Sequence, residues 1–365
     1  MSNQLKINFI LLLLFGQTFL SSCQGQKGSD DPQPVGKFVS KIDQAAGNIF
    51  QDSKSNYWFG TLEQGVFKYD GKSIIQFTAT DGLSGNRIRG IQEDRKGNIY
   101  FDTGQGINKY DGKSIITLEK SDAPKGNWKL ELDDLWFAGN WNENGPYRYD
   151  GEYLHHLEIP KHELEDEFYR INKLATYSPY EVYKIYKDRK GNIWIGTSVF
   201  GACRFDGNEI NWISEREMTE IDEGPAPGVR SIFEDGDGNF WFSSNVNHKY
   251  KVLEEKSLPL DSKLRYEKVE AIDNSSEPEM SSYFMSILED NVGDIWMATY
   301  DSGVWRHDGQ ELYHYDVIID KKDVSIFTIY KDNSGELWLG THDAGPLKFN
   351  GKTFEKYLPE ITLDN

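Results

Sequence analysis

Histidine, cysteine, serine and acidic side chains are the residues of this sequence that could carry catalytic or metal chemistry. The seven histidines lie at positions 155, 156, 162, 248, 307, 314 and 342, and no pair has the spacing of a zinc site. No serine lies in a Gly-x-Ser-x-Gly nucleophile motif. His342 with Glu63 or Asp343 is the only acid–base combination that we keep as a candidate. We therefore predict no catalytic residue, no metal and no cofactor.

The segment Asp235–Asn239 reads Asp-Gly-Asp-Gly-Asn, as at the start of a calcium-binding loop. The rest of that loop is missing, because a strand-like apolar run follows where a bidentate glutamate is needed. The corresponding segment Asp188–Asn192 carries Arg and Lys in place of the acids, so we interpret both as hairpin turns. Cys203 lies in a strand-like run and is expected to pack in the core.

The N-terminus is interpreted as a targeting segment. Lys6 and the apolar run 7–15 fit a secretory signal peptide, and the run is too short for a permanent membrane span. Leu20-Ser21-Ser22-Cys23 resembles the lipobox of bacterial lipoproteins, which implies that Cys23 is acylated; the alternative is an ordinary signal peptide with a chance cysteine. We predict a signal peptide over 1–22 and a flexible tether over 23–35. The expected location is the outer membrane of a Gram-negative bacterium, facing the periplasm or the surface, with the lipid as the only membrane contact.

Charge and composition restrict the remaining classes of function. The 365 residues include 40 Lys and Arg against 59 Asp and Glu, a formal net charge of −19, which argues against nucleic-acid binding. Aromatic residues make up 14%, too many for a disordered acidic chain. Abundant aromatic residues together with 34 glycines favour many short strands joined by tight turns.

One phrase of the Asn-Ile-Trp-Ile-Gly-Thr type recurs seven times along the chain. Its central aromatic residues are Trp58, Tyr100, Trp136, Trp194, Trp241, Trp296 and Trp338. The mean spacing of about 47 residues is that of propeller blades. An apolar run ending in an acidic residue precedes most copies, and a third run closing on Asp-Gly or Asn-Gly follows most of them. These dipeptides predict type I′ hairpin turns.

Four strands in each of seven repeats predict an all-β fold, a seven-bladed β-propeller of four-stranded antiparallel blades over 36–358. The alternative of two β-sandwiches does not explain one phrase repeated seven times. We expect the seam of the ring to join the segment 36–43, or the first blade, to the last strand near 353–358, with a tail over 359–365. The spacing of Leu164, Phe168, Ile171 and Leu174 predicts an inserted helix over 161–174.

The best copy of the repeat, Asp188–Gly207, resembles the two-component regulator propeller repeat, and the resemblance extends over roughly 42–357. It implies an extracytoplasmic propeller that senses a ligand, as in hybrid sensor kinases often linked to polysaccharide use. The chain ends at Asn365 without the membrane helix and kinase of those sensors. We therefore expect a stand-alone binding protein that does not signal across a membrane alone.

The loops after the Trp strands differ in sequence between blades, and we expect them to share one rim with the inter-blade connections. Side chains that differ at equivalent positions can encode specificity, and aromatic faces beside amides and carboxylates suit sugars or peptides. The predicted ligand-binding residues are Trp141, Phe200, Tyr300, Asp301, His342 and Asp343.

Three hypotheses for function follow. The preferred one is a non-catalytic, lipid-anchored propeller of the cell envelope that binds a small molecule, a glycan or a protein partner. The second is a lyase or hydrolase with chemistry at the central mouth, because streptogramin lyases carry a similar Trp-strand phrase, although their following Ile-Gly motif is absent here. The third is a structural subunit of an envelope complex.

Overall fold

The structure is a computed structural model that describes residues 35–42, 45–121, 128–139, 143–213, 215–219, 228–244, 247–253, 264–272, 283–357 and 361. The predicted signal peptide, Cys23 and Trp141 lie outside the described residues, as do nearly all of the predicted tether and tail. Among the described residues, no helix has the length and apolar composition of a membrane span.

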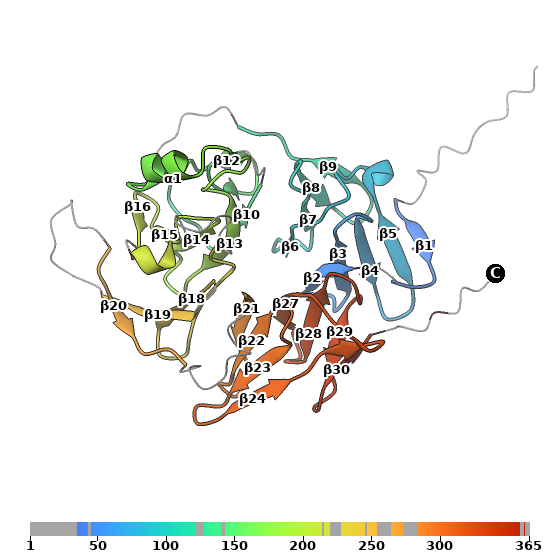
Figure 1. The fold of residues 1–365 in the computed structure, drawn as a ribbon. Helices are drawn as coiled ribbons and strands as arrows, with labels where there is room; N and C mark the ends of the chain where they lie inside the picture. Colours follow the sequence, from blue (N-terminus) through green and yellow to red (C-terminus); the bar gives the residue numbers. More distant parts are fainter. Residues whose placement is uncertain are drawn as a thin grey trace, which may run out of the picture. The chain divides into compact units, whose positions relative to one another are not determined.

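Seven antiparallel sheets follow one another around a ring, which confirms the predicted seven-bladed propeller (Figure 1). Blade 1 holds β2 (Ala46–Gln51), β3 (Tyr57–Thr61), β4 (Val66–Tyr69) and β5 (Ile74–Phe77), with β1 (Lys37–Val39) added outside β5. Blade 2 holds β6 (Gly90–Glu93), β7 (Ile99–Asp102), β8 (Ile107–Tyr110) and β9 (Ile115–Thr117). Blade 3 holds β10 (Leu135–Phe137), β11 (Tyr147–Tyr149) and β12 (Leu154–His156). Blade 4 holds β13 (Val182–Lys187), β14 (Ile193–Thr197), β15 (Ala202–Phe205) and β16 (Ile210–Trp212).

The C-terminal half continues the same order of strands. Blade 5 holds β17 (Ser231–Glu234), β18 (Asn239–Ser243), β19 (Asn247–Val252) and β20 (Tyr266–Val269). Blade 6 holds β21 (Phe284–Glu289), β22 (Ile295–Thr299), β23 (Val304–His307) and β24 (Leu312–Tyr315). Blade 7 holds β27 (Ile326–Lys331), β28 (Leu337–Thr341), β29 (Leu347–Phe349) and β30 (Phe354–Lys356). The short hairpin β25 (Ile318–Ile319) and β26 (Lys322–Asp323) connects blades 6 and 7, and two 3-10 turns cover Ala79–Asp81 and Arg216–Met218.

The acidic residue at the end of the first strand has a structural role that the sequence left open. In blade 4, Asp188 Oδ2 accepts a hydrogen bond of 3.0 Å from Nε1 of the buried Trp194, and Asp188 Oδ1 accepts the backbone N–H groups of Lys190 and Asn192. The same Asp-to-Trp bond recurs in blades 1, 5, 6 and 7 at 2.8–2.9 Å, and a tyrosine replaces the tryptophan in blade 2. One carboxylate therefore folds the first turn and provides an acceptor for the blade's central ring.

The Asp-Gly dipeptides form turns, as predicted, but these turns are not type I′. In blade 1, Gly71 has a φ of 88°, whereas Asp70 is not among the residues with positive φ. The Asp70 carboxylate instead accepts the backbone N–H groups of Lys72 and Ser73 at 2.9 and 2.8 Å. The aspartate thus closes the turn with its side chain, and only the glycine needs the left-handed region.

The ring is closed by side-chain packing between blades 1 and 7, as expected, and the ring of Tyr357, just after the last strand, lies 6.1 Å from that of Tyr69 in blade 1. β1 pairs with β5 inside blade 1, and the four strands of blade 7 all come from the end of the chain. At the seam, the ring of Tyr57 lies 4.8 Å from that of Trp338, and the Tyr57 hydroxyl donates to Asp332 at 2.7 Å. The hydroxyl of Tyr330 accepts the backbone N–H of Gln51 at 2.9 Å.

Deleting residues 350–365 is expected to destabilise the whole ring. The deletion removes β30, the buried Phe354, and Tyr357, whose ring packs 4.7 Å from Trp338 at the seam. Each blade is supported by its neighbours, so the truncated protein should unfold at a clearly lower temperature in one cooperative transition. Calorimetry checks this, and an unchanged melting temperature would show that blade 7 does not support the rest.

Blade 3 departs from the predicted four strands. The described residues 128–132, where its first strand is expected, form no strand, and the backbone N–H of Trp128 bonds to Gly207 of blade 4. Side chains of blade 2 occupy the inner edge of β10 instead. Arg89 donates to the carbonyl of Gly139 at 2.5 Å, and Gln92 donates to the carbonyl of Trp136. Blade 2 therefore satisfies backbone groups that an inner strand would otherwise pair.

The inserted helix is present but shorter than predicted. α1 covers Glu165–Ile171 and packs Phe168, which is fully buried, onto the core of blade 4. Leu174 lies beyond the helix and is 93% exposed, so the predicted apolar stripe does not continue to it. The stripe is interrupted because Asn172 ends the helix.

Candidate functional site

The inner strands of six blades share an isoleucine that sets a common register. These residues are Ile49, Ile91, Ile185, Ile232, Ile287 and Ile329. Three residues after each isoleucine comes the turn aspartate. The inner strand starts about two residues before each isoleucine. This start lies at the end of the propeller that carries the inter-blade connections, and we call that end the loop face. These six positions, which we call the mouth ring, hold Gly47, Arg89, Tyr183, Arg230, Met285 and Phe327.

Local backbone irregularity places the mouth ring at the opening of the central channel. In blade 4 the pairing of the first two strands shifts between Val182 and Lys184, so Tyr183 forms a bulge. Blades 1, 6 and 7 show the same shift at their mouth-ring residues. A bulged residue leaves the ladder and its side chain is redirected. In blades 2 and 5, Arg89 and Arg230 precede the first paired residue of the inner strand. In Figure 1 the inner strands β2, β6, β13, β21 and β27 lie nearest the centre.

One arc of the mouth ring, on blades 2, 4 and 5, is charged. Arg230 lies over the ring of Tyr183 at 4.3 Å, and Arg89 lies 3.7 Å from the Glu181 carboxylate. Burial raises the pKa of Glu181, although Arg89, Arg230 and Arg87 all act to lower it. Burial also raises the pKa of the Tyr183 hydroxyl. Arg89 is thus the ion-pair partner of Glu181, and Arg87 and Arg230 add positive charge near it.

The other arc, on blades 6 and 7, which we call the aromatic arc, holds Met285 and Phe327, and two of the predicted site residues, Tyr300 and His342, pack against Phe327. The ring of Phe327 lies 6.1 Å from that of Tyr300 and 5.6 Å from that of His342. The backbone also joins these loops, because Ile326 N–H donates to the carbonyl of Tyr300 at 2.8 Å. Asp301 and Asp343 are exposed beside these residues on the same loops.

The remaining predicted site residues do not join this group. Phe200 is fully buried, with its ring stacked 4.6 Å from that of His162 and packed 4.9 Å from that of Tyr180. Phe200 is therefore not exposed on the rim, because Phe168 of α1 packs against it with its ring 6.0 Å away. Trp141 lies outside the described residues. Phe327, Arg230 and Tyr183 were missed by the sequence analysis, although the shared isoleucine locates them.

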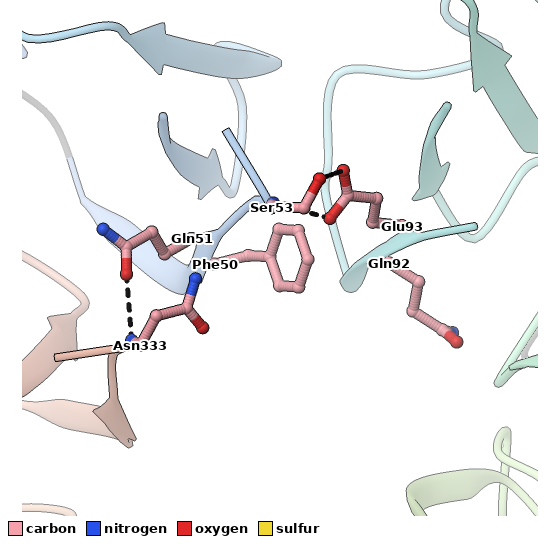
Figure 2. A pocket seen from close by; sticks show the side chains of 6 residues that line it. All are labelled: Phe50, Gln51, Ser53, Gln92, Glu93 and Asn333. Atoms are coloured by element: carbon pink, nitrogen blue, oxygen red, sulfur yellow. Dashed lines mark hydrogen bonds between the residues drawn. The ribbon is translucent and has the colours of Figure 1, made fainter. Parts of the chain in front are cut away.

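The opposite end of the channel, which we call the turn face, carries a pocket of about 480 Å³. Figure 2 shows its lining residues, which come from blades 7, 1 and 2: Phe50, Gln51, Ser53, Gln92, Glu93 and Asn333. Both oxygens of Glu93 accept hydrogen bonds from Ser53 at 2.7 Å, and Gln51 accepts the backbone N–H of Asn333 at 2.9 Å. Much of the polar lining is therefore used to link neighbouring blades.

The residues considered for metal or catalytic chemistry have structural contacts. The Asp235 carboxylate accepts from Trp241 Nε1 at 2.9 Å and pairs with Lys249 at 3.1 Å, as a turn residue does. Burial raises the pKa of the Cys203 thiol. Within the described part of the chain, no group of three His, Cys, Asp or Glu side chains is arranged for a metal, and no hydrogen bond joins the His342 ring to Glu63 or Asp343.

Four segments of the chain match the family model described as two-component regulator propeller. They are residues 82–105, 176–199, 223–246 and 320–343. Each matched segment contains the inner strand and the second strand of one blade, in blades 2, 4, 5 and 7. No curated protein shows significant sequence similarity to the chain.

Solved structures share the fold at low sequence identity. The extracellular domain of BT4673 from B. thetaiotaomicron, described as a one-component or hybrid two-component system, is 21% identical with a TM-score of 0.55. The match covers 88% of this chain and 40% of that chain, so this chain corresponds to less than half of it. A catalytically inactive variant of virginiamycin B lyase from Staphylococcus aureus, crystallised with quinupristin, is 16% identical with a TM-score of 0.55. That match covers 85% of this chain and 98% of the lyase.

Proposed function

Because this chain carries two-component regulator propeller repeats, we propose that it is an extracytoplasmic binding protein whose ligand is recognised at the loop-face mouth of the propeller. The fold matches the extracellular domain of a one-component or hybrid two-component system. The proposal includes attachment to the outer membrane through acylated Cys23 and a role without catalysis.

The observation that carries the proposal is the mouth ring. Six blades each place one residue at the same level, and these residues are one glycine, two arginines, one tyrosine, one methionine and one phenylalanine. Tyr300 and His342 extend the ring on the aromatic arc through their contacts with Phe327. Aromatic faces beside a few polar groups are typical of small-molecule sites.

A thermal-shift screen with saccharides and short peptides tests the proposed site. A ligand that stabilises the native protein should fail to stabilise the variant Tyr300→Ala/Phe327→Ala/His342→Ala. Each lost aromatic contact is expected to cost about 1 kcal/mol or more of binding free energy. The matched control is Phe50→Ala at the turn-face pocket, which should keep the full shift. Loss of the shift in the control alone would move the site to the turn face.

The proposed anchor is tested separately. Replacing Cys23 by Ala is expected to move the protein from the detergent phase to the aqueous phase in Triton X-114 partitioning, because the acyl chains supply the membrane affinity. The Cys203→Ala variant, which removes a buried thiol, should partition like the native protein. Unchanged partitioning and mass of the Cys23 variant would refute acylation.

A catalytic role is tested at the same mouth. Incubation of any ligand found in the screen with the native protein should leave it chemically unchanged in mass spectrometry. Turnover that disappears in His342→Ala would contradict the non-catalytic proposal and favour the lyase hypothesis.

A further inference from the structure

We propose that the loop-face mouth selects a carboxylate attached to a flat apolar body. This inference rests on the proposed function, because it assumes that the mouth is the ligand site. The carboxylate would pair with Arg230 on the charged arc, and the apolar body would lie against Phe327 on the aromatic arc.

The charged arc concentrates positive charge on a chain whose formal net charge is −19. Arg89 already has Glu181 at 3.7 Å, and it donates to the carbonyls of Gly139 and Val182. Arg230 has a different contact, because its guanidinium lies over the Tyr183 ring and not beside any described carboxylate. In the part of the chain that the structure describes, no carboxylate lies within ion-pair distance of Arg230. A ligand carboxylate can supply this counter-ion with charge-assisted hydrogen bonds.

The electrostatics around Glu181 support an added anion over an added cation. Arg87, Arg89 and Arg230 all influence this single glutamate. Among the described residues, Asp102 is also an acid of the charged arc, but it is buried against Arg89 and accepts the backbone N–H of Gly139 at 2.9 Å. Low-dielectric walls around a group of one charge sign focus its field on the opening.

Blade 1 places no side chain beside Phe327 on the aromatic arc. Gly47 is the mouth-ring residue of blade 1, and a Cβ built on it would lie 3.8 Å from Phe327 Cδ2. The glycine therefore leaves one side of the Phe327 ring without a neighbouring side chain from blade 1. Tyr300 packs edge-on to Phe327, and His342 lies at a tilted angle to it. The proposal places the planar body against the Phe327 ring and its acidic group at Arg230.

The test compares 2-naphthoate with 2-naphthamide, which have the same ring system with and without the charge. Isothermal titration calorimetry on the mature protein should show that naphthoate binds about tenfold tighter or more, the effect expected for a hydrogen bond to a charged group. Arg230→Gln should abolish this preference and Arg230→Lys should retain part of it, with thermal unfolding used to confirm that both variants fold. The matched control Arg95→Gln, at an exposed arginine of the turn face, should keep the full preference.

The outcomes separate this inference from the proposed function. Three results would overturn the carboxylate proposal: equal affinity for the two probes, a preference that survives in Arg230→Gln, or no binding of naphthoate. In each case the proposed binding site at the mouth would still be tested by the thermal-shift screen described above. Phe327→Ala should weaken both probes equally. If both probes bind with affinities that neither Phe327→Ala nor Arg230→Gln changes, the mouth is not the site, and the proposed function fails as well.

Discussion

Replacing Arg89 by Ala is expected to lower the free energy of unfolding by about 3–5 kcal/mol, the cost of removing one partner from a buried charge network. Arg89 joins three blades, because it donates to the carbonyl of Gly139 in blade 3 and to that of Val182 in blade 4. Its loss also leaves Glu181 and Asp102 without their nearest cation. The measurement is equilibrium denaturation in urea.

The control for this prediction is Arg95→Ala, because Arg95 forms an ion pair with Asp133 at 2.5 Å but is 69% exposed. Screening by solvent should limit its effect to about 1 kcal/mol or less. Arg89→Lys is expected to be intermediate, since one ammonium cannot replace a guanidinium that bonds two carbonyls. Equal effects of Arg89→Ala and Arg95→Ala would show that side chains of blade 2 do not support blade 3.

Replacing Asp188 by Ala is expected to lower the free energy of unfolding by about 2–4 kcal/mol, because it leaves a buried indole N–H without an acceptor and opens the turn. Asp188 accepts from Trp194 Nε1, from the Asn192 side chain, and from two backbone N–H groups. Trp194 is fully buried, so water cannot replace the lost acceptor.

A double-mutant cycle isolates the Asp-to-Trp bond. Trp194→Phe keeps an aromatic ring and removes the N–H, so Asp188→Ala should cost less in that background. The control Asp206→Ala removes an exposed turn aspartate that accepts two backbone N–H groups at 2.9 Å, and it should cost about 1 kcal/mol or less. Additive effects of Asp188→Ala and Trp194→Phe would contradict the proposed coupling.

The propeller was predictable because its stabilising contacts lie within each repeat. The turn aspartate, the Trp strand and the Asp-Gly turn are close in sequence, so a repeated phrase reveals them. The missing inner strand of blade 3 was not predictable, because residues 128–132 have a strand-like composition and side chains of blade 2 replace that strand. The seam also depends on contacts between residues far apart in sequence, such as Tyr57 with Asp332.

The candidate site was predictable in part. Tyr300 and His342 were found because they directly follow the repeated phrase, where blades differ. Phe200 lies two positions further along the corresponding loop, but the inserted helix buries it, and the repeat pattern does not show which loop a neighbouring insertion covers. Arg230 and Phe327 were missed because inner strands were treated only as core, although the residue two positions before each shared isoleucine lies at the mouth.

Hydrogen–deuterium exchange of the mature protein, with and without a ligand from the screen, tests the central claim most directly. The account predicts slower exchange at the loop-face mouth, in residues 283–286, 300–304, 325–328 and 342–345. Exchange around the turn-face pocket, in residues 50–53, 92–94 and 332–334, should not change. Protection confined to the turn-face residues would contradict binding at the loop-face mouth.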